Sequence, residues 1–282
     1  MTEMGLVPPR FRKSVLQHAL GVRYIPGYPM FLAIQGPPGD GKSYQAALTL
    51  QFAEIKVFRL SGSLLSGEFE RNSVDAVRNL YKSAAEHAGM SVPKGGNTAL
   101  LLEDFDLSPA SQRDGTRYTV NSQLLTGFLM NLHDDVASCD VGTARRLPIY
   151  LTGNDFSYLH GPFVRHGRID FFTWEPTPEE RTDVVFAALR DYVIDIREED
   201  VALLCKKHSS LPISAFTAAA LRVCSASLYD KLAQLGGEKF DALTKDPSAR
   251  QLLKVPLSAV EPELKEQADA NRRPRKFGVK TR

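Results

Sequence analysis

The residues that stand out first for chemistry form a glycine-rich run with the phosphate-binding spacing G-x-x-x-x-G-K-[S/T]. The run consists of Gly36, Pro37, Pro38, Gly39, Asp40, Gly41, Lys42 and Ser43, and Tyr44 follows it. Glycines let successive backbone N–H groups point at phosphate oxygens, Lys42 can reach the β- and γ-phosphates, and the Ser43 hydroxyl can bind Mg²⁺. The alternative is a chance Gly/Pro turn before a helix. The pattern predicts a binding site for ATP and Mg²⁺ at residues 36–44.

A second candidate group follows the apolar run Leu100–Leu102, where the sequence continues Glu103-Asp104-Phe105-Asp106. If this run is a buried parallel strand, its carboxylates lie at the sheet edge where ligands bind. We expect Glu103 and Asp104 to serve the metal together with Ser43, and Asp104 to activate the attacking water. The order is the reverse of the usual Asp-Glu pair, so hydrolysis is expected to be slow. The alternative is a strand end whose acids only face solvent.

Polar groups also follow the next apolar run, at residues 148–152. Asn154 is placed to hold the attacking water or the γ-phosphate by hydrogen bonds. Arg165 and Arg168 come shortly afterwards, and an always-charged, planar guanidinium suits the charge that develops on a phosphoryl group. The alternative for these two residues is a pair of surface arginines in a turn.

The elements needed to position these groups alternate between strands and helices. Strands are expected at 30–34, 56–60, 98–102, 148–152 and 169–174, and helices at 10–20, 42–54, 74–88 and 121–133. This alternation predicts a three-layer α/β domain with a mostly parallel sheet.

The pattern changes at Thr177, a candidate N-cap before Pro178. Helical periodicity then continues to about residue 235. We therefore expect an entry segment at 1–28, an α/β domain at 29–175, a small helical lid at 176–236 and a weakly ordered basic tail at 237–282. The tail ends in the arginine- and lysine-rich stretch 272–282, which is either a solvated end or a contact for nucleic acid or another acidic partner.

Composition places the chain among ordinary globular proteins, because 43% of its 282 residues are hydrophobic and 24% are charged, with a net charge of +2. No apolar stretch approaches the roughly 20 residues that span a bilayer, and residues 1–13 lack the apolar core of a secretion signal. The three scattered cysteines suit a reducing compartment, so a cytoplasmic location without membrane association is expected.

Several stretches resemble rubisco activase, a member of the AAA+ ATPases. These are GDGKSYQ (39–45), SGSLLSGEFERNSVDAVRNLYKSAAE (61–86), YTVNSQLLTGFLMNLHDD (118–135) and TGNDFSYLHGPFVRHGRIDFFTWEPTPEER (152–181). The last contains the R-x-G-R-x-D box of the AAA+ ATPases, whose arginines reach the nucleotide of a neighbouring subunit. The resemblance covers roughly residues 11–230.

The resemblance implies a hexameric ring that remodels a protein client, with rubisco as one possible client. Residues 64–67 and 108–117 would then be two pore loops, and Arg222 would be a second sensor of the nucleotide. Two other readings stay open: a nucleic-acid-handling ATPase that uses the basic tail, and a nucleotide-gated assembly protein whose weak hydrolysis only changes its oligomeric state.

Overall fold

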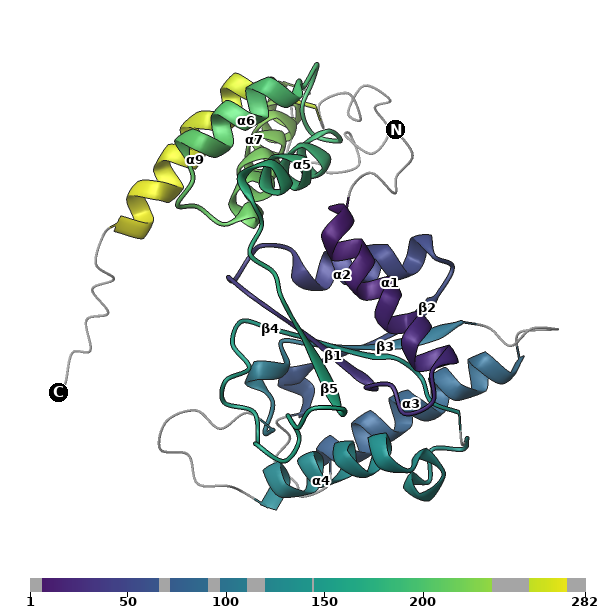
Figure 1. Cartoon of the computed structure of the whole chain (residues 1–282). Helices are drawn as coiled ribbons and strands as arrows, with labels where there is room; N and C mark the ends of the chain where they lie inside the picture. Colours follow the sequence, from purple (N-terminus) through teal and green to yellow (C-terminus); the bar gives the residue numbers. More distant parts are fainter. Residues whose placement is uncertain are drawn as a thin grey trace. The chain divides into compact units, whose positions relative to one another are not determined.

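The computed structural model describes residues 7–65, 72–90, 97–110, 120–143, 145–234 and 254–272. The chain divides into two compact units, Met1–Glu175 and Pro176–Arg282 (Figure 1). None of the helices within the described ranges is long and apolar enough to cross a bilayer.

The first unit contains a five-stranded parallel sheet with the strand order β2-β3-β4-β1-β5. The strands are β1 (Phe31–Gln35), β2 (Lys56–Ser61), β3 (Thr98–Glu103), β4 (Ile149–Gly153) and β5 (Ile169–Thr173). β3 and β4 are buried over almost their whole length because helices cover both faces of a parallel sheet. The predicted α/β fold class is confirmed.

Four helices cover this sheet, α1 (Pro9–Tyr24) and α2 (Lys42–Phe52) on one face and α3 (Asn72–Met90) and α4 (Val120–Asp134) on the other (Figure 1). On the α3/α4 face, Leu100 and Leu102 of β3 join a core with Leu125 and Leu129 of α4. On the opposite face, the Tyr150 hydroxyl donates to the Val15 carbonyl oxygen of α1 at 2.9 Å. Three short 3-10 turns complete the unit: η2 (Gly62–Leu65), η3 (Phe105–Leu107) and η4 (Val136–Cys139).

Helix α1 is longer than the sequence predicts, because it continues through Gly21 to Tyr24. A Cβ at Gly21 would lie 2.6 Å from the Tyr28 ring. The glycine therefore provides space for an aromatic side chain and does not end the helix.

The second unit is helical, with α5 (Pro178–Leu189), α6 (Glu198–Lys207), α7 (Ile213–Gln234) and α9 (Leu257–Arg272). α5 begins as predicted, with Thr177 as N-cap. The Thr177 hydroxyl oxygen accepts from the Glu180 N–H at 3.2 Å, and the Glu180 carboxylate accepts from the Thr177 N–H at 3.0 Å. This reciprocal pair is a capping box.

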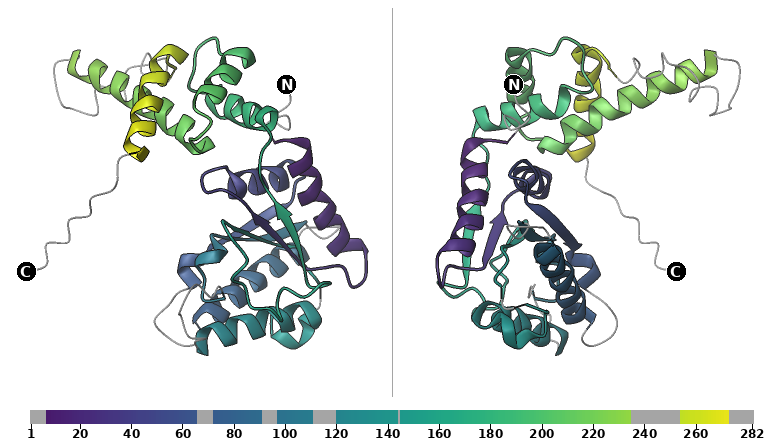
Figure 2. Two further views of the ribbon diagram at one scale, coloured as in Figure 1. Left: turned by 60° about the vertical axis from the view of Figure 1, so that its left-hand side comes forward. Right: turned by 90° about the vertical axis from the view of Figure 1, so that its right-hand side faces the viewer.

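The expectation of weak order beyond residue 237 is wrong for the stretch that forms α9, which lies across α7 (Figure 2). Val260 and Leu264 are fully buried, and Val255 forms a parallel bridge with Val193 before the helix begins. The two buried residues are four positions apart, which places them on one helix face. The surrounding Asp, Lys, Pro and Ser residues conceal this short apolar stripe in the sequence.

Candidate functional site

The register of the sheet brings the phosphate loop beside Asn154. β1 and β4 pair in parallel, with Gln35 opposite Gly153, so the loop that leaves β1 and the residue that follows β4 start at the same edge. β3 pairs with β4 with Leu102 opposite Leu151, so the acidic residues emerge at this edge too. Three segments far apart in the sequence therefore meet at the carboxyl ends of three adjacent strands.

The phosphate loop needs its glycines for two different reasons. Gly39 and Gly41 have φ angles of 79° and 76°, a left-handed conformation that side chains disfavour. At Gly36 a Cβ would lie 2.0 Å from the Trp174 carbonyl oxygen, so no larger residue fits. The Trp174 indole N–H also donates to the Asp40 carbonyl oxygen at 2.9 Å. Trp174, just after β5, thus holds the loop in place, and it is not among the residues that the sequence predicts for the site.

Lys42 lies inside the loop and is 7% exposed. Its Nζ donates to the carbonyl oxygens of Gly36 and Pro37 at 2.9 and 2.7 Å, and to Asn154 Oδ1 at 3.2 Å. Burial lowers the pKa of Lys42, and the nearby Asp40, Asp106 and Asp104 oppose that shift. The ammonium group thus lies in the field of three carboxylates and contacts Asn154 directly.

Ser43 and Tyr44 follow Lys42 and have different surroundings. The Ser43 hydroxyl lies 2.6 Å from that of Thr152, the last residue but one of β4. Thr152 therefore belongs to the site, although sequence analysis did not single it out. The Tyr44 side chain is 65% exposed. Pro37 and Pro38 are exposed too, and they form the outer side of the loop.

The predicted metal ligand Glu103 has a basic neighbour. Its Oε1 accepts hydrogen bonds from Nε and Nη2 of Arg59, which lies on the adjacent strand β2. Asp104 has a φ of 50°, in the left-handed region, and its carbonyl oxygen lies 2.3 Å from where a Cβ of Gly62 would be. Gly62 thus allows η2 to approach the acidic turn closely.

A third acid, Asp106, is part of the same cluster and is 1% exposed. A Cβ at Gly153 would lie 2.9 Å from Asp106 Oδ1, which places this carboxylate against the end of β4. Sequence analysis noted Asp106 in the acidic run but did not assign it to the site. Its position in the sequence, two residues after Asp104, could have indicated that it belongs to the site.

Arg165 and Arg168 occur in contrasting environments. The Arg165 side chain is exposed, and no hydrogen bond or ion pair joins it to the described residues. Arg168 is half-buried and pairs with Asp134 at the end of α4, with Nη2–Oδ2 at 2.6 Å and Nε–Oδ1 at 3.2 Å. Its Nη1 also donates to the Pro162 carbonyl oxygen at 2.8 Å. Together with His133, Arg168 lowers the pKa of Asp134, and the Arg168 hydrogen bond is the largest cause.

The remaining predicted residues lie outside this cluster or outside the described ranges. Arg222 belongs to α7 of the second unit, where its Nη1 lies 3.6 Å from Glu263 Oε2.

In the first predicted pore loop, Leu64 is 67% exposed and Leu65 is buried, whereas Ser66 and Gly67 are outside the described residues. Only residues 108–110 of the second loop are described, and the basic stretch 273–282 is not.

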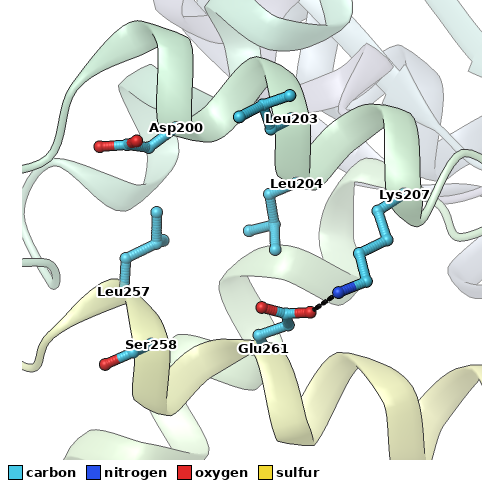
Figure 3. A pocket seen from close by; sticks show the side chains of 7 residues that line it. All are labelled: Asp200, Leu203, Leu204, Lys207, Leu257, Ser258 and Glu261. Carbon is cyan, nitrogen blue, oxygen red and sulfur yellow. Dashed lines mark hydrogen bonds and ion pairs between the residues drawn. The ribbon is translucent and has the colours of Figure 1, made fainter.

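The pocket in the second unit is unrelated to the predicted site. It has a volume of about 380 Å³ and lies between α6 and α9, where Lys207 and Glu261 form an ion pair across it (Figure 3). None of the predicted site residues lines this pocket.

The arrangement fits a nucleotide with Mg²⁺. Left-handed glycines, a buried lysine whose partners are neutral oxygens, and a serine hydroxyl together form a cradle for phosphate groups. Among the described residues, no group of three or more His, Cys, Asp or Glu side chains is placed to hold a metal ion by itself. Mg²⁺ at phosphate sites commonly uses one or two protein oxygens together with phosphate and water, and the Ser43 hydroxyl and the Asp104 carboxylate can supply such oxygens.

Comparison with known proteins places this geometry in a family. Residues 32–177 match the family described as "ATPase family associated with various cellular activities (AAA)". The chain is 30% identical over 241 residues to a ribulose bisphosphate carboxylase/oxygenase activase of Anabaena sp., an alignment that covers 82% of this chain and 57% of the relative. It is 31% identical over 217 residues to the chloroplastic activase of Arabidopsis thaliana, covering 75% of this chain and 44% of the relative.

The chain thus spans about half the length of the curated relatives that it matches. The family match covers more than half of the chain and contains the phosphate loop, the acidic turn, Asn154 and both arginines. The resemblance to rubisco activases that the sequence motifs indicated is confirmed, and the chain belongs to the AAA family of ATPases.

Proposed function

We propose that this chain is the ATP-hydrolysing part of a ring-forming protein-remodelling motor of the rubisco-activase type. The observation that carries the proposal is the contact of Lys42 with Asn154 beside the Ser43–Thr152 pair. This contact joins a phosphate-binding loop to a polar side chain that can sense the γ-phosphate. The acidic turn lies at the same sheet edge and supplies the third component that hydrolysis requires.

In this proposal Lys42 exchanges its carbonyl partners for β- and γ-phosphate oxygens. The exchange is favourable because a phosphate carries more negative charge than a carbonyl oxygen. Ser43 and the acids Glu103 and Asp104 hold Mg²⁺, which neutralises charge on the transferred phosphoryl group. Asp104 orients the attacking water and accepts its proton, and Asn154 holds that water by a hydrogen bond.

The exposed Arg165 is proposed to act on the nucleotide of a neighbouring subunit, since a guanidinium without an ion pair to the described residues is available to a neighbour. Arg168 is proposed to assist in one of two ways. Either its bidentate pair with Asp134 opens so that the guanidinium reaches the nucleotide, or the pair stays closed and holds the Arg165 turn in place. Arg222 is proposed to report the nucleotide state to the helical unit.

The client is proposed to be a protein, engaged by loops that include Leu64. The large apolar exposure of Leu64 supports this assignment, because a pore loop needs an apolar side chain to grip an extended segment. The names of the relatives make rubisco the first client to test.

The test separates nucleotide binding from chemistry. Asp104→Asn should retain ATP affinity within a few-fold and lose single-turnover hydrolysis, because the amide cannot accept the proton. Lys42→Ala should weaken ATP binding by about 10- to 100-fold, the effect of losing a charge-assisted hydrogen bond. Lys13→Ala, an exposed lysine on α1, is the matched control. Persistent single-turnover hydrolysis in Asp104→Asn, or unchanged ATP affinity in Lys42→Ala, would overturn the assigned roles.

A further inference from the structure

Another pocket lies in the first unit, at the edge of the sheet opposite the phosphate loop. It has a volume of about 100 Å³ and is lined by the end of α1, the start of β3 and the segment just before β4. A single enclosed water needs only about 10–15 Å³, so this pocket has room for a larger group. Because the strands are parallel, their amino ends lie here and their carboxyl ends lie at the nucleotide site.

Three arginines line this pocket. Arg23 comes from α1, and Arg145 and Arg146 come from the segment before β4. The described residues that line the pocket include no Asp or Glu, and neither Arg23 nor Arg145 forms an ion pair with a described carboxylate. Asp134 acts electrostatically on Arg146 from outside the lining, so the charge of Arg23 and Arg145 is the part that favours an anionic ligand.

Two residues that line the pocket each have a polar atom enclosed by protein. Thr98 is 4% exposed, and its hydroxyl has no hydrogen-bond partner among the described residues. The Arg146 Nε is also enclosed and lacks a described partner, whereas its Nη2 donates to the Tyr28 carbonyl oxygen at 2.8 Å. Protein covers both atoms, so the accessible positive charge of the pocket comes from the exposed Arg23 and Arg145.

The rim of the pocket adds an apolar surface. Leu20 and Tyr24 of α1 line the pocket and are 58% and 68% exposed. The Arg23 guanidinium lies over the Tyr24 ring, 5.4 Å from its centroid. A ligand with an apolar or ring-shaped part beside its charged group can therefore contact both the rim and the arginines.

We propose that this pocket is a binding site for the phosphate group of a small molecule, separate from the nucleotide site. Three arginines suit the several oxygens and double charge of a phosphate group better than the single charge of a carboxylate. The phosphate is either inorganic phosphate or a phosphate monoester whose organic part lies against Leu20 and Tyr24.

The test uses full-length chain carrying Lys42→Ala, which weakens phosphate binding at the nucleotide site. Isothermal titration with inorganic phosphate should show one site per chain. Arg23→Gln combined with Arg145→Gln should weaken that binding by about tenfold or more. Arg190→Gln, an arginine of the helical unit, is the matched control and should leave the affinity unchanged.

Phenyl phosphate that binds more tightly than phosphate assigns the site to a monoester, whereas equal affinities assign it to inorganic phosphate. No binding in the Lys42→Ala protein, unchanged affinity in the pocket variant, or equally tight binding of acetate would each overturn the proposal.

Discussion

At the scale of single residues, Glu103 ends β3 with one carboxylate oxygen held by Arg59 of the neighbouring strand. An Asp at this position would have a side chain one methylene shorter. The longer Glu side chain reaches Arg59, and Glu103 is the last residue of β3, at the edge where the metal is proposed to bind. Arg59 therefore competes with a cation for the same carboxylate.

Removing Arg59 should strengthen Mg²⁺ binding. In Arg59→Gln we expect the Mg²⁺ concentration that half-saturates ATP hydrolysis to fall about two- to tenfold, because an exposed ion pair contributes up to about 1 kcal/mol. Lys13→Gln removes a positive charge from α1 and serves as control. An unchanged Mg²⁺ dependence would show that Glu103 does not contribute to the metal site.

His18 gives a prediction about pH. It is 2% exposed between α1 and the sheet, its ring lies 5.1 Å from that of Tyr150, and burial lowers its pKa from 6.5 to about 3. The folded state thus resists a proton that the unfolded chain accepts below pH 6.5. The contribution to stability is complete above that pH and is lost as the pH falls toward 3, at about 1.4 kcal/mol per pH unit.

His18→Leu should therefore flatten the pH dependence of folding. We expect the loss of unfolding free energy between pH 7.5 and pH 5 to be smaller in the variant than in the wild type by about one to two kcal/mol. Urea unfolding at the two pH values measures it. Parallel pH profiles for the two proteins would show that His18 is protonated in the folded state.

At the scale of elements, the start of the helical unit depends on a local signal. The capping box of Thr177 and Glu180 satisfies two N–H groups at the first turn of α5. Cap substitution should lower the unfolding free energy without affecting the chemistry at the nucleotide site.

Thr177→Ala is expected to cost about 0.5–2 kcal/mol of unfolding free energy. Ser209→Ala, an exposed serine in the turn after α6, is the control and should change stability by less than about 0.5 kcal/mol. Denaturant unfolding of both variants makes the comparison. Equal effects in the two proteins would show that the cap has no stabilising role.

At the scale of the whole molecule, the central question is whether a single chain contains a complete catalytic site. Lys42, the acidic turn and Asn154 come from one chain, whereas the exposed Arg165 is available to another. The trans role that we propose for Arg165 requires assembly, so ATP hydrolysis per chain should rise with protein concentration.

Mixing two inactive variants tests this directly. Arg165→Ala retains its acids, and Asp104→Asn retains its arginine, so in the proposed ring a mixture of the two would contain some interfaces with both groups intact. We expect the mixture to hydrolyse ATP when neither variant does so alone. A silent mixture of variants that still co-assemble would exclude a trans role for Arg165.

Local patterns in the sequence predicted the order of strands and helices, the phosphate loop, the acidic turn, the cap at Thr177 and the family. These features depend on neighbours within a few positions, where spacing, apolar periodicity and turn chemistry act. For the same reason the periodicity of α9 was missed, since two buried residues among many polar ones give a weak signal.

Only the tertiary structure decided which side chains meet. Four contacts of the site join segments that are distant in sequence. They are Trp174 with the phosphate loop, Thr152 with Ser43, Asp106 with Gly153, and Arg59 with Glu103. Such contacts follow from the register of the parallel strands and from the close approach that glycines permit. The spacing of residues along the chain determines neither the register nor which segments approach each other. The pocket with its three arginines likewise exists because α1, β3 and β4 converge at one edge of the sheet.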